Sequence, residues 1–136
     1  MKLLGFNFTK ISIEKAKDSL SELKIENQID IPDITEVKQD VLKSKDELLA
    51  IKFKYVIKYA PDIAHINLEG NILVSVEAKL AKETMKKWKN KEFPEELRIP
   101  LFNLIFRKAG LKAMELEDEM NLPLHIQMPA IKKKDN

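Results

Sequence analysis

The chain has 136 residues with 24 basic and 22 acidic side chains, so its formal net charge is only +2 and no strong field favours nucleic acid. The absence of cysteine excludes disulfides, thiolate metal sites and cysteine nucleophiles. No apolar run has the form of a signal peptide or approaches the ~20 residues of a membrane span. We therefore expect a cytoplasmic protein, with one domain over residues 1–131 and a polar tail over 132–136.

The first two predicted strands are irregular. In residues 4–13 two phenylalanines and two isoleucines fall on opposite parities, and a bulge near Thr9 and Lys10 would return both pairs to one face. Residues 25–31 also alternate. Pro32 then breaks this strand or places it at a sheet edge, because proline cannot donate a hydrogen bond to a ladder.

The clearest pattern is a pair of long alternating segments. Apolar side chains occupy every second position in the first segment: Leu49, Ile51, Phe53, Tyr55, Ile57 and Tyr59. After a Pro-Asp turn, the alternation resumes at Ala64, Ile66, Leu68, Gly70, Ile72, Val74 and Val76. This pattern predicts an antiparallel hairpin with one buried face, in which Gly70 marks a bulge or the close approach of another backbone. With the two earlier strands it gives a four-stranded antiparallel meander.

Two helices are predicted to follow the sheet. Residues 78–91 carry a thin apolar stripe that includes Trp88, together with a cluster of lysines at 86–91. Such a cluster beside an aromatic ring is one way to bind RNA. We favour a solvated helix face anchored by Trp88, because glutamates are interspersed and the net charge is small.

The second helix, residues 95–120, is apolar around too much of its circumference for a simple surface helix. One face would cover the sheet, and the surplus predicts a homo-oligomer, either a dimer or a tetramer. Gly110 costs about 1 kcal/mol relative to alanine in a helix, so we expect a close backbone contact there. Residues 122–129 then alternate as a short extended segment.

A search for catalytic chemistry finds none. His65 and His125 lack partners at metal-ligand spacing and are both expected on the surface. The carboxylates of Glu115, Glu117, Asp118 and Glu119 are expected on a solvated helix face. The three glycines are isolated, which excludes a Walker loop and a dinucleotide fingerprint. We therefore predict an α+β protein that is not an enzyme, with no catalytic residues, no metal and no cofactor.

The order of these parts resembles the export chaperone SecB and its shorter archaeal relatives. In that family a glycine lies in the fourth strand ahead of an apolar stretch, and an apolar segment with proline follows the long helix. Gly70 in INLEGNIL (66–73) and the segment LPLHIQMP (122–129) occupy those places here. The bacterial chaperone is strongly acidic and ends in an acidic tail that helps engage its ATPase partner. This chain is nearly neutral with a lysine-rich tail, so the resemblance implies the fold rather than that partner.

The resemblance implies a holdase chaperone for unfolded or export-competent polypeptides, whose oligomer presents grooves lined by apolar and aromatic side chains. The expected client-binding residues are Phe6, Phe8, Tyr55, Trp88 and Phe93. The expected oligomer-interface residues are Phe102, Phe106 and Gly110. For each client-binding residue, ordinary core packing is the alternative. Two other functions stay open, namely an adaptor that binds one specific protein, and RNA binding through residues 86–91, although we do not expect nucleic acid as a partner.

Overall fold

The computed structural model describes residues 1–18, 22–38 and 45–133, and this part of the chain forms a sheet followed by two helices. In chain order the elements are β1 (Lys2–Lys15), β2 (Lys24–Val37), β3 (Asp46–Ala60), β4 (Ala64–Glu77), α1 (Ala78–Trp88) and α2 (Glu95–Glu119). The predicted α+β class is confirmed. The end of the predicted polar tail, residues 134–136, lies outside the described residues.

The central hairpin has the buried face that its alternation predicts. β3 and β4 pair antiparallel, with Ile51 opposite Ile72 and Phe53 opposite Gly70. The odd-numbered residues 49–59 of β3 and the even-numbered residues 64–76 of β4 are all buried. They form one core with residues of the long helix, among them Leu97, Leu101, Ile105, Ala109 and Ala113.

The strand order corrects part of the predicted topology. The order in the sheet is β1-β4-β3-β2, so the meander holds for β2, β3 and β4 but β1 lies beside β4 instead of β2. This is a Greek-key arrangement. As the chain leaves β1, it passes the tip of the hairpin, where the N–H groups of Ala16 and Lys17 donate to the Ile63 carbonyl oxygen (2.8 and 3.2 Å).

The first strand contains the bulge that its sequence predicts, and the second lies at the sheet edge, one of the two places that Pro32 predicts. The pairing of β1 with β4 shifts register between Phe8 and Lys10, which brings both halves of β1 onto the core face. β2 is an edge strand whose register shifts between Asp30 and Asp33, around Pro32. Proline is tolerated there because the ladder of hydrogen bonds is already interrupted at the register shift, so the missing N–H removes no regular bond.

Gly70 lies where two backbones approach closely, as predicted. A Cβ at this position would overlap the carbonyl oxygen of Asn7 and would lie 2.6 Å from Cε1 of Phe53. The register of β1 against β4 shifts between Phe8 and Lys10, so a bulge lies next to this contact. Only glycine fits this position without a shift of β1.

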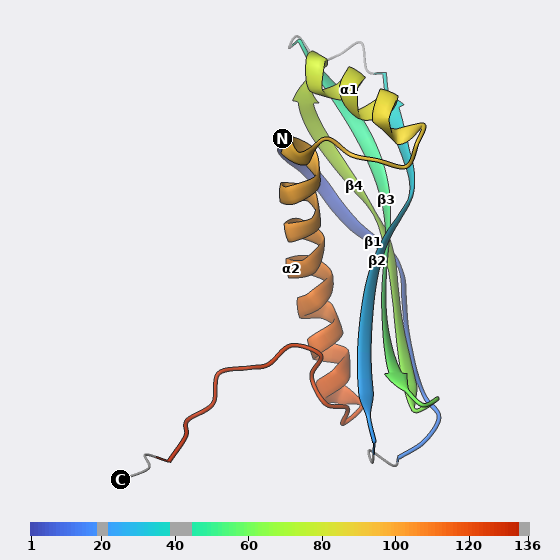
Figure 1. Ribbon diagram of the computed structural model, residues 1–136, viewed down its shortest axis with the longest axis vertical. Coiled ribbons are helices and arrows are strands. Elements are labelled where there is room, and N and C mark those ends of the chain that lie inside the picture. Colours follow the sequence, from blue (N-terminus) through green and yellow to red (C-terminus); the bar gives the residue numbers. More distant parts are fainter. Residues whose placement is uncertain (19–21, 39–44, 134–136) are drawn as a thin grey trace.

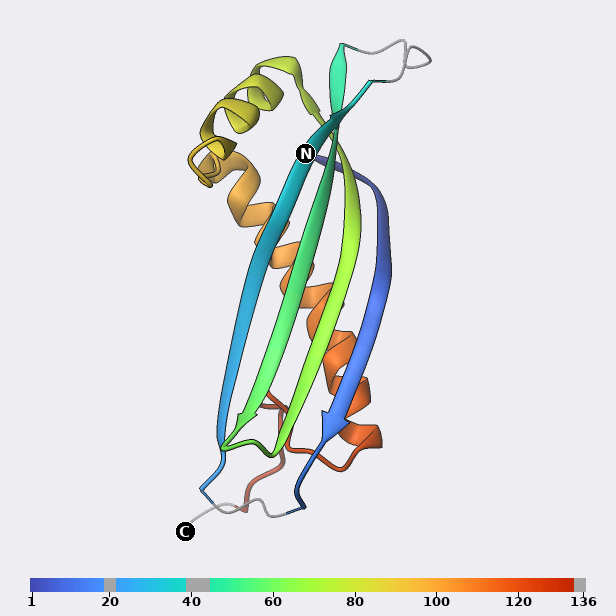
Figure 2. The same ribbon diagram turned by 90° about the vertical axis from the view of Figure 1, so that its right-hand side faces the viewer.

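The two helices cover one face of the sheet and leave the other face bare (Figures 1 and 2). α2 runs along the length of the sheet, and α1 crosses its upper end against β3 and β4. α2 begins after Pro94, whose carbonyl oxygen accepts the N–H groups of Leu97 and Arg98. Within the described residues, no helix is long and apolar enough to cross a membrane.

After α2 the chain turns back, crosses that helix and leaves the body of the protein (Figure 1). We call residues 122–128 of this segment the C-terminal strap. The strap is not a strand, although its sequence alternates, because it pairs with no other strand among the described residues. Its first residue, Leu122, is buried, and its N–H donates to the Glu117 carbonyl oxygen at 2.8 Å.

Candidate functional site

Three phenylalanine rings meet at the β1 edge of the sheet. Phe6 stacks on Phe53 with ring centroids 5.0 Å apart, and Phe8 meets both rings edge-on at 5.2 and 6.0 Å. Phe53 is fully buried, whereas Phe6 and Phe8 are only partly buried against the core. The register places these rings on the helix-covered face, since Phe6 is opposite Ile72 and Phe8 is opposite Gly70. We call Phe6 and Phe8 the β1 cluster.

A second aromatic group lies where α1 is joined to α2. Trp88, at the end of α1, packs on Phe93 with centroids 5.3 Å apart, and Phe93 meets Phe102 of α2 at 6.0 Å. All three rings are partly buried. The Lys91 ammonium lies 4.3 Å from the centre of the Trp88 ring, a cation–π contact. We call Trp88, Phe93 and Phe102 the helix-junction cluster.

Of the five expected client-binding residues, Tyr55 stands apart from the others. The structure brings Phe6 together with Phe8 and Trp88 together with Phe93, but Tyr55 has no exposed surface. Its ring meets the rings of Phe106 and His125, with centroids 6.3 and 6.0 Å away. The strap therefore covers Tyr55.

The three residues expected at an oligomer interface lie in different surroundings along α2. Phe106 is 45% exposed, while Phe102 is partly buried in the helix-junction cluster. Gly110 is buried, and a Cβ there would lie 3.5 Å from Cδ1 of Ile126. The close backbone contact expected at Gly110 is therefore wrong, because the nearest atoms belong to strap side chains at ordinary contact distance.

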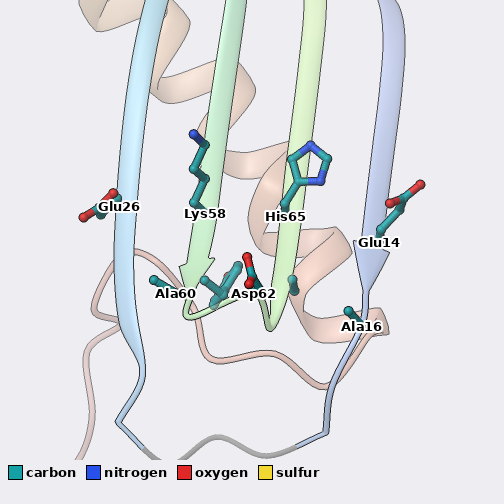
Figure 3. Close-up of a pocket in the computed structure, with 9 residues that line it drawn as sticks. Glu14, Ala16, Glu26, Lys58, Ala60, Asp62 and His65 are labelled. Atoms are coloured by element: carbon teal, nitrogen blue, oxygen red, sulfur yellow. The ribbon is translucent and has the colours of Figure 1, made fainter.

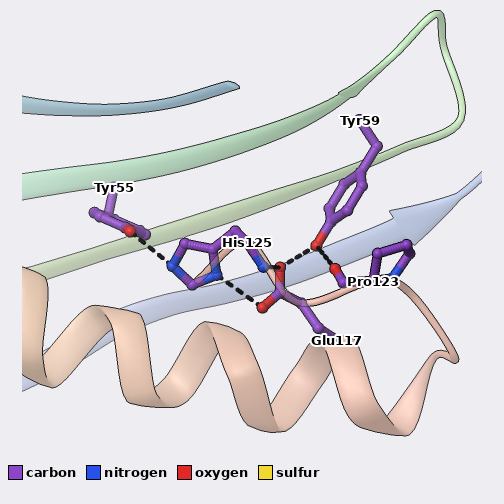
Figure 4. Close-up of polar contacts among 5 residues, drawn as sticks. All are labelled: Tyr55, Tyr59, Glu117, Pro123 and His125. Atoms are coloured by element: carbon purple, nitrogen blue, oxygen red, sulfur yellow. Dashed lines mark hydrogen bonds and ion pairs between the residues drawn. The ribbon is translucent and has the colours of Figure 1, made fainter. Parts of the chain in front are cut away.

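A buried polar network joins α2, the strap and β3 (Figure 4). The Glu117 carboxylate accepts hydrogen bonds from His125 Nδ1 (2.7 Å), from the His125 backbone N–H (3.1 Å) and from the Tyr59 hydroxyl. The Tyr59 hydroxyl also lies 2.8 Å from the Pro123 carbonyl oxygen. Because a carboxylate only accepts, Nδ1 of His125 carries a hydrogen, and Nε2 of the same ring lies 3.0 Å from the Tyr55 hydroxyl oxygen.

Both tyrosines of the network resist ionisation. Burial raises the pKa of Tyr59 far above its ordinary value, and the hydrogen bond to Glu117 acts in the same direction. Burial also raises the pKa of Tyr55, with the Asn27 side chain acting in the opposite direction and the Glu117 charge in the same one. The network therefore favours neutral phenols beside one carboxylate.

Two sequence expectations are wrong at this network. The His125 ring is fully buried instead of exposed, and so is the Glu117 side chain, which was expected on a solvated face. The cause is the strap, which folds back onto α2. The remaining members of those groups are exposed as expected: His65, Glu115, Asp118 and Glu119. The signal for Glu117 was present, because it lies seven residues after Gly110 and four after Ala113 on the buried helix face.

Two of the hollows on the bare face of the sheet differ in their lining. One, of about 410 Å³ at the hairpin end, is lined by charged side chains of both signs, including Lys58 and Asp62, and by His65 (Figure 3). The other, of about 420 Å³, is mainly apolar and includes Ala50 and Leu73. Within the described ranges, no three His, Cys, Asp or Glu side chains are arranged to hold a metal ion. We assign no chemistry to either hollow.

Comparison with known proteins shows which solved fold this architecture resembles. No family model matches the sequence, and no curated protein matches it. Among solved structures, it is similar to the Mycobacterium tuberculosis SecB-like chaperone Rv1957 in complex with a ChAD peptide from the antitoxin HigA1 (Rv1956), with a TM-score of 0.55 and 9% identity. The match covers 98% of this chain and 92% of that one. The predicted SecB-like fold is confirmed.

Proposed function

We propose that this protein is a non-enzymatic, SecB-like holdase chaperone that binds unfolded or export-competent polypeptides in the cytoplasm. The observation that carries the proposal is the presence of two partly exposed aromatic groups, the β1 cluster and the helix-junction cluster, on a SecB-like fold. Partly exposed rings offer apolar contact area to many different chains, because burial of apolar surface depends little on partner sequence.

The physical basis of such binding is mass action on the unfolded state. A protein that binds unfolded chains lowers the concentration of free aggregation-prone chains, and no covalent step is needed. The exposed apolar residues of α2 support a further part of the proposal, a homo-oligomer that uses this helix. Three apolar side chains on α2 are strongly exposed in the single chain: Ile99 (52%), Phe106 (45%) and Leu111 (62%).

A direct test is suppression of the aggregation of reduced α-lactalbumin, followed by light scattering. The reductant does not alter this protein, because its chain has no cysteine. At stoichiometric concentration we expect the wild type to suppress scattering. The double variants Phe6→Ser/Phe8→Ser and Trp88→Ser/Phe93→Ser should each lose most of that effect.

The matched control is Ile11→Ser, which removes an apolar side chain that is 46% exposed and lies outside both clusters and outside α2. It should hold the client as the wild type does. The proposal is wrong if the folded wild type leaves scattering unchanged, or if the control loses as much activity as the cluster variants.

The second candidate is an adaptor that binds one specific protein. The similar structure supports it, because Rv1957 is seen with a peptide from a single antitoxin. An adaptor should form a stoichiometric complex with one partner, and an excess of reduced α-lactalbumin should not displace that partner. A holdase should release it under the same competition.

RNA binding through residues 86–91 has less support. Lys91 lies over the Trp88 ring and Phe93 packs against that ring, so the surface that a base would stack on is already in contact. Lys87 pairs with Glu83 at 3.5 Å. If RNA were the ligand, its affinity would fall steeply as salt rises.

A further inference from the structure

The C-terminal strap is attached to the domain mainly by side chains. Beyond Leu122, it makes no backbone-to-backbone hydrogen bond within the described ranges. Its anchors are the buried Leu122 side chain, the Pro123 carbonyl oxygen and the two bonds from His125 to Glu117. A segment held in this way separates from the domain without breaking any strand or helix.

The strap lies on the domain as a bound peptide would, with one side chain buried and others exposed. Its His125 side chain points inward and is fully buried, whereas Ile126 and Met128 are 42% and 54% exposed. Ile131, just beyond the strap, is fully exposed. Apolar side chains that flank one buried polar anchor are what an extended unfolded chain would offer to the same surface.

We propose that the strap is a stand-in for client, and that an extended client segment binds to Tyr55, Gly110 and Glu117 after displacing it. This inference rests on the proposed holdase function. It adds that the client segment is an extended peptide and that the strap competes with it for the same surface. The occupant is an extended peptide with apolar residues around a side chain that donates a hydrogen bond, as His125 does now.

The chemistry of the covered surface decides which side chain fits. The Glu117 carboxylate can only accept, so histidine, asparagine or a basic side chain satisfies it. An acidic side chain would place a second negative charge against a buried carboxylate, which is strongly unfavourable. The strap surface therefore selects against acidic segments and retains apolar ones with neutral or basic donors.

The test uses the full chain and a fluorescein-labelled peptide with the sequence of residues 122–131, LPLHIQMPAI, followed by fluorescence anisotropy. His125→Ala removes the anchor of the internal competitor, so it should bind the peptide at least ~10-fold more tightly than the wild type. Replacing the peptide's histidine with glutamate should reverse that gain. Gln127→Ala, an exposed strap position, is the matched control and should bind as the wild type does.

A second variant protects the test against misfolding. Ile126→Ser loosens the strap but leaves the Glu117 network intact, and it should tighten peptide binding by roughly threefold. The inference is overturned if folded His125→Ala and Ile126→Ser bind the peptide no more tightly than the wild type while all three suppress α-lactalbumin aggregation. If the wild type and both strap variants fail to suppress aggregation, the holdase function itself is wrong.

Discussion

Replacing Gly70 with alanine should destabilise the protein through one identifiable clash. The new Cβ would overlap the Asn7 carbonyl oxygen and lie 2.6 Å from Cε1 of Phe53. The Phe53 residue is 1% exposed and its ring packs against both Phe6 and Phe8, so it has no free space to enter. The overlap can then be relieved only if β1 moves away from β4 next to the β1 bulge.

The size of the effect follows from two opposing terms. Overpacking of a core costs typically 1–3 kcal/mol, and a backbone oxygen on one side places Gly70→Ala near the upper end of about 3 kcal/mol. Alanine reduces the conformational freedom of the unfolded chain, which raises the free energy of unfolding by roughly 0.4–1 kcal/mol. We expect a net loss of about 2 kcal/mol, which for a chain of this size lowers the melting temperature by roughly 7 °C.

The assay is urea unfolding followed by far-ultraviolet circular dichroism, with Gly5→Ala as the matched control. A Cβ at Gly5 would meet only the Leu73 Cβ at 3.8 Å, an ordinary contact, so this variant should be as stable as the wild type or slightly more stable. A stability of Gly70→Ala within about 0.5 kcal/mol of the wild type, or an equal loss of stability in both variants, would refute the clash at Gly70.

Three further predictions concern the network and α2. Because the folded-state pKa values of Tyr55 and Tyr59 are raised and the unfolded values lie near 10, their contribution to stability is full below pH 10 and is lost above it. As these are the only tyrosines, tyrosinate absorbance near 295 nm should appear only with unfolding, and a normal titration of the native protein would contradict this. Glu117→Leu should cost about 2 kcal/mol in urea unfolding, because two donors of His125 lose their acceptor, whereas the exposed Glu119→Leu should change little. Phe106→Glu should lower the mass of the assembly seen by light scattering if α2 forms the oligomer interface, and an unchanged mass would exclude that interface.

Local patterns predicted the strands well because their causes are local. Strict alternation over β3 and β4 requires one buried face, and the change of parity within β1 requires a bulge, which lies between Phe8 and Lys10. Gly70 was predicted for the same reason, since a glycine inside an apolar strand signals a missing side chain.

The strand order depends on contacts that no local pattern contains. The sequence of β1 would suit a place beside β2 or beside β4. In the structure β1 lies beside β4, and the chain that follows it bonds to the Ile63 carbonyl oxygen at the hairpin tip. His125 was misplaced for a related reason. Alternation in the strap resembles a strand with polar residues outward, but the strap pairs with no strand in the described part of the chain, so its alternation does not determine which side is buried.

The aromatic clusters were partly predictable. Aromatic side chains near the sheet edge and near the helix junction were identified as candidates, but the covering of Tyr55 follows from the path of the strap. Side-chain type predicts what a surface would bind, whereas exposure depends on segments that pack over it from a distant part of the sequence.

The most direct test of the account is the mass of the purified protein in solution, measured by light scattering with and without reduced α-lactalbumin. The account predicts a multiple of the 15.8 kDa chain mass that increases when the unfolded client is added, with the client remaining in solution. A 15.8 kDa species whose mass does not change while the client aggregates would contradict both the oligomer and the holdase function.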